Sequence, residues 1–543
     1  MADSSHKLFS LLCLLFFSTT CVHSSDASVG VEVDLSFLRY LCATTPYPNL
    51  CLSSLNISID PSPSASPSPS PSPNPNINDY LIHSLQKAVS ETTNLINLFN
   101  NVGKPNIIDK QRGGGGLRDC RELHQSSLAS LEESISGIRS SDMDTTDVAI
   151  YLSAVLTNKN TCLEGLDSAT GTMKPVLVKA VINTYKHASN SLAILSNPAM
   201  GTDPENNPLK GDPEWLTSTD QSFFDDSHGD EYDPKEKLVV AVDGTGDFRT
   251  ITEAINSAPI NSMERIVIYV KEGIYEENVE IPCNRTNIVM IGDGSDVTVI
   301  TGNRSVGDGW TTFRSATLAV NGKGFLARDI AFKNSAGPKS QAVALRVSAE
   351  LAAFYRCAMD GYQDTLYVHS WRQFYKECDI SGTIDFIFGN AAVVLQECNI
   401  ISKEPLHGQA TVITAQSRDD PNEPSGIVIQ SCNINASFDS SSVKSYLGRP
   451  WRNYSRTVYL ESFIDGFIDP KGWTEWNDDK KRLDTLYYGE FENYGPGSST
   501  DNRVKWSGYH VMTDEDANNF TVSKFINDDD WLQVTHFPFD LGI

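Results

Sequence analysis

Two aspartates in the C-terminal half of the chain are placed where they could share one chemical site. Asp364 follows Cys357 by seven residues, and Asp385 follows Cys378 by the same seven residues. If the cysteines mark equivalent places in consecutive repeats, the aspartates lie on neighbouring parallel strands, which are about 4.8 Å apart. Two carboxyl groups this close cannot both ionise at low cost, so the pKa of one is raised while the other stays charged. This division suits an acid and a nucleophile in one site.

Neutral amides and aromatic rings flank these aspartates. Gln363 directly precedes the first aspartate and Gln341 lies in the repeat before it, so both could donate hydrogen bonds to a developing oxyanion. Phe386 and Phe388 follow the second aspartate. Their rings could face a sugar and exclude water, or they could belong to the core, and the sequence leaves both places open.

An arginine and a tryptophan are spaced for one face of a strand. Arg449 and Trp451 are two residues apart, so an extended chain directs both side chains to the same side. Arg449 could hold Asp385 ionised and orient it through a bidentate bond. Trp451 could form a floor for a pyranose ring. Alone, Arg449 would be interpreted as a surface cation and Trp451 as a buried indole.

A repeat of about 20 residues is the element that must position these side chains. From residue 238 onward the chain consists of short β-branched runs separated by Gly, Asn and Asp. Four similar triplets begin at Cys357, Cys378, Cys398 and Cys432, and the first three starts are 21 and then 20 residues apart. This pattern predicts an all-β, right-handed parallel β-helix in which the triplets form an inward-facing ladder. The cysteines could be core residues, and stacked neighbours such as Cys378 and Cys398 could also bridge.

The N-terminal part has helical periodicity over residues 26–200 and predicts an all-α four-helix bundle. Its cysteines favour two disulfides, Cys42 with Cys51 and Cys120 with Cys162. A Ser-Pro tract at 61–75 must be a non-helical loop, because alternating prolines favour an extended chain. Residues 201–236 lack apolar periodicity and are predicted to be the linker before a β-helix domain over 237–543.

The start of the chain and its charge indicate an exported protein. Residues 1–24 have the basic start, the short apolar block and the small residues of a signal peptide, and no later stretch reaches the roughly 20 apolar residues of a membrane span. A net charge of −26 argues against nucleic acid and anionic membrane as partners.

Nine cysteines remain once the two of the signal peptide are removed, so at least one is unpaired, and we expect Cys283 to be it. Six N-x-S/T sequons fit a glycoprotein and begin at Asn56, Asn284, Asn303, Asn435, Asn453 and Asn519.

The C-terminal part resembles plant pectin methylesterases. The matching segments, in the order of that family, are 340–345, 361–367, 385–390, 447–451 and 487–490. The N-terminal part resembles, less closely, the pectin methylesterase inhibitor domain that many plant members carry as a pro-region, with matches at 42–48 and 161–165.

The resemblance implies a role for each residue of the site. Asp385 would be the nucleophile, Asp364 the proton donor and base, and Gln363 would stabilise the transition state. The substrate-binding residues would be Thr311, Gln341, Arg449 and Trp451. The family also implies a disulfide between Cys378 and Cys398. The reaction would be hydrolysis of C6 methyl esters of homogalacturonan, the backbone of pectin, to a carboxylate and methanol through an aspartyl acyl-enzyme.

The same resemblance implies the setting of the reaction. We expect no cofactor and no metal, pectin as substrate, the chain's own inhibitor-like domain or separate inhibitor proteins as partners, a monomer, and a secreted, extracellular location in the plant cell wall. The N-terminal part would be autoinhibitory. Residues 201–237 contain three separated lysines and no dibasic pair, which departs from family members that lose their pro-region.

Other classes of protein predict different observations. A serine esterase is disfavoured because the chain has no G-x-S-x-G motif, and His369 is interpreted as structural. A β-helical pectin glycosidase or lyase would release reducing or unsaturated ends without methanol. An inhibitor or wall-binding protein would suppress a separate esterase and release no methanol itself.

Overall fold

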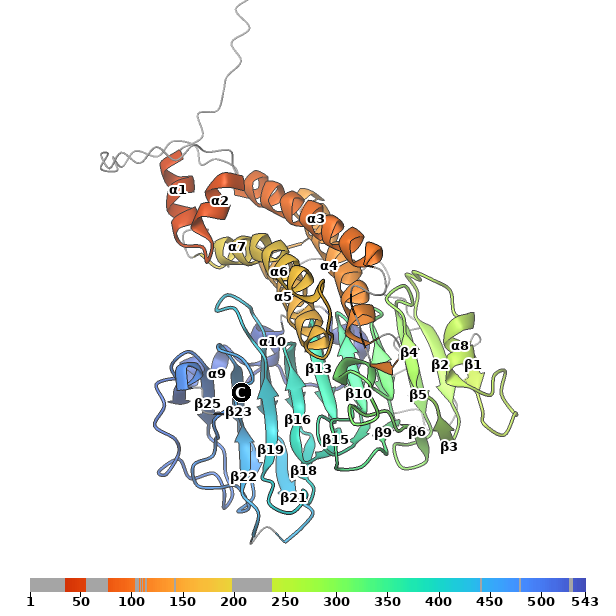
Figure 1. Ribbon diagram of the computed structural model, residues 1–543. Coiled ribbons are helices and arrows are strands. Elements are labelled where there is room, and N and C mark those ends of the chain that lie inside the picture. Colours follow the sequence, from red (N-terminus) through yellow and green to blue (C-terminus); the bar gives the residue numbers. More distant parts are fainter. Residues whose placement is uncertain are drawn as a thin grey trace, which may run out of the picture.

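The computed structural model describes residues 35–54, 77–102, 115–140, 143–197, 237–439, 442–477, 480–526 and 531–543, together with residues 107, 109, 111 and 112. The expected signal peptide (1–24), Ser-Pro loop (61–75) and linker (201–236) lie outside the described residues. The described part comprises an N-terminal group of helices and a C-terminal stack of parallel strands (Figure 1).

Seven α-helices form the described N-terminal part: α1 (Leu35–Ala43), α2 (Pro48–Ser54), α3 (Ile77–Asn101), α4 (Gly115–Ser140), α5 (Thr145–Asp167), α6 (Lys174–Thr184) and α7 (Lys186–Leu195). Both expected disulfides are present, Cys42–Cys51 between α1 and α2 and Cys120–Cys162 between α4 and α5. Helices α4 and α5 approach each other closely at two glycines, where a Cβ on Gly116 would lie 1.9 Å from the carbonyl oxygen of Gly165. Among the described helices, none has both the length and the apolar composition needed to cross a membrane.

The strands of the described C-terminal part pair in parallel and form three sheets of eleven, seven and eight strands. The eleven-stranded sheet contains β1 (Lys237–Val240), β2 (Ile266–Val270), β5 (Ile288–Gly292), β8 (Leu326–Arg328), β11 (Ala352–Tyr355), β14 (Arg372–Lys376), β17 (Ala392–Gln396), β20 (Gly426–Gln430), β23 (Arg456–Leu460), β25 (Tyr487–Phe491) and β26 (Tyr509–Val511). The seven-stranded sheet contains β4 (Val279–Ile281), β7 (Leu318–Val320), β10 (Leu345–Ser348), β13 (Leu366–Ser370), β16 (Ile384–Gly389), β19 (Thr411–Gln416) and β22 (Ser445–Gly448). The eight-stranded sheet contains β3 (Gly273–Glu276), β6 (Thr298–Gly302), β9 (Ala331–Asn334), β12 (Ala358–Asp360), β15 (Asp379–Gly382), β18 (Asn399–Ser402), β21 (Asn433–Ala436) and β24 (Phe463–Ile464).

Successive coils contribute one strand to each sheet, which confirms the repeat read from the cysteine triplets. The apolar third residues of the triplets pair in register along the eight-stranded sheet, Met359 with Ile380, Ile380 with Ile400, and Ile400 with Ile434. All four are fully buried in the core that the three sheets enclose. The short helix α8 (Ile251–Ser257) packs Ile251, Ala254 and Ile255 into the same core, whereas α9 (Asp514–Asn518) and α10 (Val522–Phe525) pack elsewhere.

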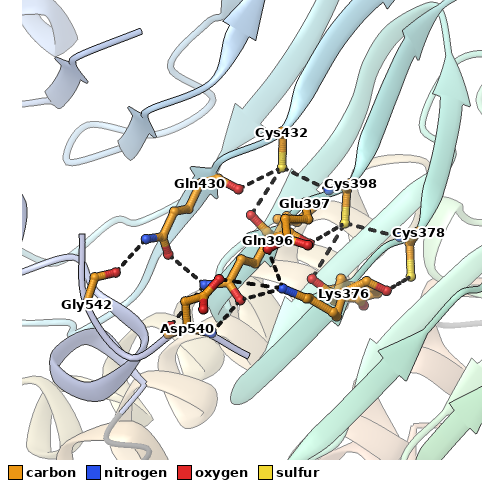
Figure 2. Close-up of polar contacts among 11 residues, drawn as sticks. Lys376, Cys378, Gln396, Glu397, Cys398, Gln430, Cys432, Asp540 and Gly542 are labelled. Atoms are coloured by element: carbon orange, nitrogen blue, oxygen red, sulfur yellow. Dashed lines mark hydrogen bonds and ion pairs between the residues drawn. The ribbon is translucent and has the colours of Figure 1, made fainter. Parts of the chain in front are cut away.

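The cysteines of the four triplets are free thiols, and Figure 2 shows Cys378, Cys398 and Cys432 stacked as a ladder. The disulfide between Cys378 and Cys398 that the family resemblance implied is absent. The amide of Cys378 donates to the Cys398 sulfur at 3.4 Å, and the amide of Cys398 donates to the Cys432 sulfur at 3.3 Å. Instead of bonding to each other, the sulfurs of Cys398 and Cys432 accept these amide hydrogen bonds. Each of the three thiols also donates to a backbone carbonyl of the core. Cys283 is also free, as expected, and is exposed.

The C-terminal tail is attached beside this ladder (Figure 2). The side-chain amide of Gln396 donates to the carbonyl of Asp540 at 3.0 Å, and that of Gln430 donates to the carbonyl of Gly542 at 2.7 Å. Lys376 is buried beneath the tail and pairs with Glu397 at 2.7 Å. The tail thus caps neighbouring strands of the eleven-stranded sheet.

Candidate active site

The seven-stranded sheet brings the two aspartates to neighbouring strands. Leu366 of β13 pairs with Ile387 of β16, so Asp364 and Asp385 occupy the same place in consecutive coils, and the amide of Asp364 donates to the carbonyl of Ile384 at 3.0 Å. The register of β16 shifts between Ile384 and Ile387, which is the signature of a bulge.

Both aspartates also have positive φ, 65° at Asp364 and 51° at Asp385, a conformation that is uncommon for residues other than glycine. The positive φ of both aspartates, together with the bulge in the coil of Asp385, changes the direction in which their side chains point. Both aspartates line one cleft, and the two residues are 8% and 4% exposed.

Arg449 holds Asp385 in the predicted bidentate bond. Its Nε donates to Oδ1 at 2.8 Å and its Nη2 donates to Oδ2 at 2.6 Å. The arginine follows β22, and its amide donates to the carbonyl of Thr414 in β19 at 3.0 Å, so the neighbouring coil fixes its position. Its guanidinium also lies over the ring of Trp476 at 4.4 Å.

The two carboxyl groups differ in their electrostatic surroundings. Burial raises the pKa of Asp364 well above its ordinary value, and the neighbouring charge of Asp385 raises it further. Burial also raises the pKa of Asp385, but the hydrogen bonds and charge of Arg449 oppose this effect. Asp364 is therefore the group that keeps its proton, and Asp385 is the group whose anion is stabilised.

The predicted binding residues line the same cleft, which has a volume of about 370 Å³. Its walls include Thr311, Gln341, Gln363 and Trp451 together with the two aspartates. Thr311 caps the short 3-10 helix η4 (Thr312–Arg314) by accepting a hydrogen bond from the amide of Arg314 at 3.1 Å. Every side chain that the sequence assigned to the site thus reaches one place.

A row of aromatic rings forms one wall. Tyr367 stacks on Phe388 at a centroid distance of 4.2 Å, Phe388 lies 5.9 Å from Trp451, and Trp451 stacks on Trp476 at 6.2 Å. Phe386, in contrast, belongs to the core between the sheets. The sequence allowed either a cleft or a core position for both phenylalanines; Phe388 lies in the cleft wall and Phe386 in the core. Trp476 was missed by the sequence reasoning, although it lies in a Trp-rich segment, 473–476, that could have drawn attention to it.

His369 has a structural role, as expected. It is fully buried, its Nε2 lies 2.9 Å from the hydroxyl of Thr161, and its Nδ1 lies 3.0 Å from the hydroxyl of Ser348. Burial holds the pKa of His369 well below its ordinary value, so the ring stays neutral.

The N-terminal helices cover the cleft, and sequence reasoning did not find the residues that do so. Gln111, Asp119, Thr161, Glu164 and Gly165 complete its walls. Helix α5 is buried on nearly all sides because it lies between the other helices and strand β13 (Figure 1). A helix with buried residues on all faces has no solvent-facing side.

Polar contacts join the two parts beside the cleft and farther from it. Arg314 pairs with Asp119 at 2.5 Å and with Glu122, and Arg452 pairs with Glu164. Further contacts are Arg372 with Asp147 at 2.9 Å, Asn390 with Thr157 at 2.8 Å and Ser189 with Asp420 at 2.6 Å. In each of these four ion pairs the helices supply the carboxylate and the β part supplies the arginine.

Potential metal ligands gather at one place in the described part of the chain. Ligand atoms of Cys120, His124 and Cys162 lie within 4.8 Å of one another inside the helical part. The two cysteines are joined in a disulfide and therefore offer no thiolate ligand. The cleft itself offers acid, nucleophile and amide donors, which suit acyl transfer.

Two family models match the chain. The Pectinesterase model matches residues 237–529, and the Plant invertase/pectin methylesterase inhibitor model matches residues 36–194. Probable pectinesterase/pectinesterase inhibitor 12 of Arabidopsis thaliana is 55% identical over the full length of both chains. Pectinesterase 2 of Citrus sinensis is 42% identical over 92% of this chain and 94% of its own. The solved pectin methylesterase from carrot is 51% identical, with a TM-score of 0.57, and its whole length corresponds to 58% of this chain.

Proposed function

The chain belongs to the pectinesterase family, and from that membership we propose that Asp385 and Asp364 hydrolyse the C6 methyl esters of homogalacturonan. The chain combines a pectinesterase domain with an inhibitor-like region, and the family's activity is carboxylic ester hydrolysis. The observation that supports the two roles best is the unequal pair itself, one aspartate bound by an arginine fork and the other left to keep its proton.

In the first half of the reaction, an oxygen of Asp385 attacks the ester carbonyl carbon of a galacturonosyl unit. Arg449 supports this step because its bidentate bond keeps the carboxylate ionised and fixes its orientation. The carbonyl oxygen becomes an oxyanion, to which the amide groups of Gln341 and Gln363 donate hydrogen bonds. Protonated Asp364 gives its proton to the departing methoxy group, and methanol leaves.

In the second half, the ionised Asp364 takes a proton from water, and the resulting hydroxide attacks the acyl carbon. The bond to Asp385 breaks, and Asp364 is again protonated. The product acid gives its proton to solvent and leaves as a carboxylate. Trp451, stacked on Trp476, supports a pyranose ring, and Thr311 contacts the substrate.

We infer that the N-terminal part is autoinhibitory, because it occupies the cleft that the substrate must enter. Helices α6 and α7, which meet at Tyr185, together act as the fourth helix of a bundle with α3, α4 and α5. A separate inhibitor protein of this kind would compete for the same cleft and could bind only after α5 has left. We further infer a right-handed coil for the β-helix, because parallel crossover connections are right-handed in nearly all cases.

The setting of the reaction follows from the same family. We propose domain boundaries at 26–200 and 237–543, a secreted monomer, and action in the plant cell wall on pectin. The charge of −26 suits a substrate whose carboxylates are largely masked as neutral esters.

Methanol release tests the proposal. The full chain is produced with a specific protease site inserted in residues 201–236, and activity on methylated pectin is measured before and after cleavage and separation. Methanol release that rises on separation supports autoinhibition by the N-terminal part. An initial burst of methanol when deacylation is slow supports an acyl-enzyme. New reducing or unsaturated ends without methanol would assign the site to a glycosidase or a lyase instead.

A further inference from the structure

A second cavity, with a volume of about 660 Å³, lies at the junction of the inhibitor-like part and the β part. Its walls come from the turn between α1 and α2, from α5, α6 and α7, and from residues 419–422, 452 and 454 of the β part. It shares no lining residue with the catalytic cleft. Sites for small ligands have volumes of about 300–1,000 Å³, so this cavity has the size of a ligand site.

Hydrogen bonds hold two walls of this cavity in place. In the turn between α1 and α2, the amide of Tyr47 donates to the side chain of Asn190 at 2.9 Å, and the side chain of Asn190 donates to the carbonyl of Tyr47 at 3.0 Å. On the β side, Asp420 accepts from the hydroxyl of Ser189 at 2.6 Å and from the amide and side chain of Asn422, both at 3.0 Å. Both oxygens of this carboxylate are thus occupied, and the walls are formed without a ligand.

The polar groups of the cavity that keep unused bonding capacity are mainly donors. The side chain of Asn160 takes part in no hydrogen bond within the described residues, and the residue is 7% exposed. Lys159 lies 3.9 Å from Asp419, which is the limit of an ion pair. Lys186 donates to Asn183 at 2.8 Å, and an ammonium group has three donors. The cavity therefore offers two amines and an amide to a ligand.

Tyrosine rings from both parts complete the cavity. Tyr47 belongs to the helical part, and the ammonium of Lys186 lies 5.3 Å from the centroid of its ring. Tyr454 belongs to the β part. Arg452 also borders the cavity, but Glu164 neutralises its charge. Tyrosine faces suit sugar rings, amines suit carboxylates, and an amide suits hydroxyl groups, so an acidic sugar matches all three kinds of group.

We propose that this cavity binds a short acidic oligosaccharide of about two or three uronic acid units, and that the bound sugar holds the inhibitor-like part on the catalytic part. Because its walls come from both parts, the cavity exists only in the covered form, and a ligand that binds one form stabilises that form by mass action. At a ligand concentration of about nine times Kd, docking strengthens by about tenfold. Binding itself does not require the esterase activity, whereas this regulatory effect rests on the proposed function.

Isothermal titration calorimetry of the uncleaved full-length chain with unesterified trigalacturonate tests the site. Lys186→Gln removes a cation from the helical wall, and Tyr454→Ala removes a ring from the β wall. Each substitution should raise Kd by about tenfold. Lys179→Gln is the matched control, because Lys179 is an exposed lysine of α6 outside the cavity, and it should leave Kd unchanged. An unchanged Kd for both cavity variants, or no binding to the unsubstituted chain, would overturn the site.

Three further probes test the chemistry of the ligand. Maltotriose has sugar rings without carboxylates, and citrate has carboxylates without rings, so neither should bind as tightly as trigalacturonate. Equal affinity for either compound would overturn the assignment to an acidic sugar. A trisaccharide that carries glucuronate distinguishes a pectin fragment from another acidic wall polysaccharide. Binding of either acidic trisaccharide supports the proposed class.

The methanol assay tests the effect of the ligand on the covered form. Saturating trigalacturonate should lower methanol release by the uncleaved chain by about tenfold, and by less than about twofold in Lys186→Gln. Equal inhibition of the two chains would overturn the regulatory effect, because the sugar would then act at the catalytic cleft. If calorimetry shows binding and the separated catalytic part releases no methanol, the proposed function fails while the site remains.

Discussion

The contact between Arg314 and Asp119 should control how tightly the inhibitor-like part covers the cleft. The two side chains are 7% and 1% exposed, and the pair is 2.5 Å apart. Glu122 binds the same guanidinium from the next turn of α4. Burial raises the pKa of Asp119 to about 6, with the charge of Arg314 opposing the shift, so the pair is ionised at about pH 7.5. Asp119→Asn removes one charge and keeps the shape of the side chain.

The magnitude follows from the burial of the pair. Removing one partner of a buried ion pair costs about 3–5 kcal/mol, because the other charge remains out of water. Here Glu122 still neutralises Arg314, so we expect about 2–3 kcal/mol. At about 1.4 kcal/mol for each factor of ten, docking should weaken by about 30- to 150-fold. While the covered form dominates, the rate of methanol release by the uncleaved chain rises by the same factor.

The assay is the initial rate of methanol release by uncleaved full-length chain at about pH 7.5, divided by the rate of the separated catalytic part. Glu132→Gln is the matched control, because Glu132 is exposed on the same helix. It should leave this ratio unchanged. A ratio for Asp119→Asn equal to that of the unsubstituted chain, with an active separated part, would refute the view that this buried pair holds the cover in place.

Three further substitutions test the catalytic site and the inhibitor-like part that covers it. Burial raises the pKa of Asp364 above its unfolded value, so the stability that the protonated group contributes is lost as pH rises through the folded pKa. Asp364→Asn should therefore raise Tm by about 2–4 °C at pH 8 and little at pH 4. An equal Tm difference at both pH values would contradict this. Arg449→Lys loses the bidentate bond to Asp385 and should lower kcat by about 10- to 100-fold in a methanol assay of the separated catalytic part, whereas an unchanged kcat would show that the fork is dispensable. Gly116→Ala places a Cβ against the carbonyl of Gly165, so it should force α4 and α5 apart and raise the activity of the uncleaved chain; wild-type activity together with an unchanged Tm would show that the helices accommodate the methyl group.

The repeat and the chemistry could be predicted because both leave regular marks in the sequence. The offset of seven residues from Cys357 and Cys378 placed the aspartates on neighbouring strands, and the spacing of Arg449 and Trp451 placed both in the cleft. The two disulfides of the helical part followed from the count and placement of its cysteines.

Features that depend on contacts between distant segments could not be predicted. Glu164 and Asp119 enter the cleft because the helices dock on the β part, and no periodic pattern encodes that docking. The bulge in β16 leaves Phe386 in the core and Phe388 in the cleft, although both follow the same aspartate. The thiols of Cys378 and Cys398 are free, and the spacing of their triplets in the sequence is the same for a free pair as for a bridged one.

The most direct test of the central claim is methanol release by the separated catalytic part carrying Asp385→Ala, with Asp385→Asn beside it to preserve the shape of the site. If Asp385 is the nucleophile, both variants should lose activity by at least about four orders of magnitude while remaining folded and keeping the pectin affinity of the unsubstituted protein. Activity within about tenfold of the unsubstituted protein would contradict the account, because catalysis would then not require attack by this carboxylate.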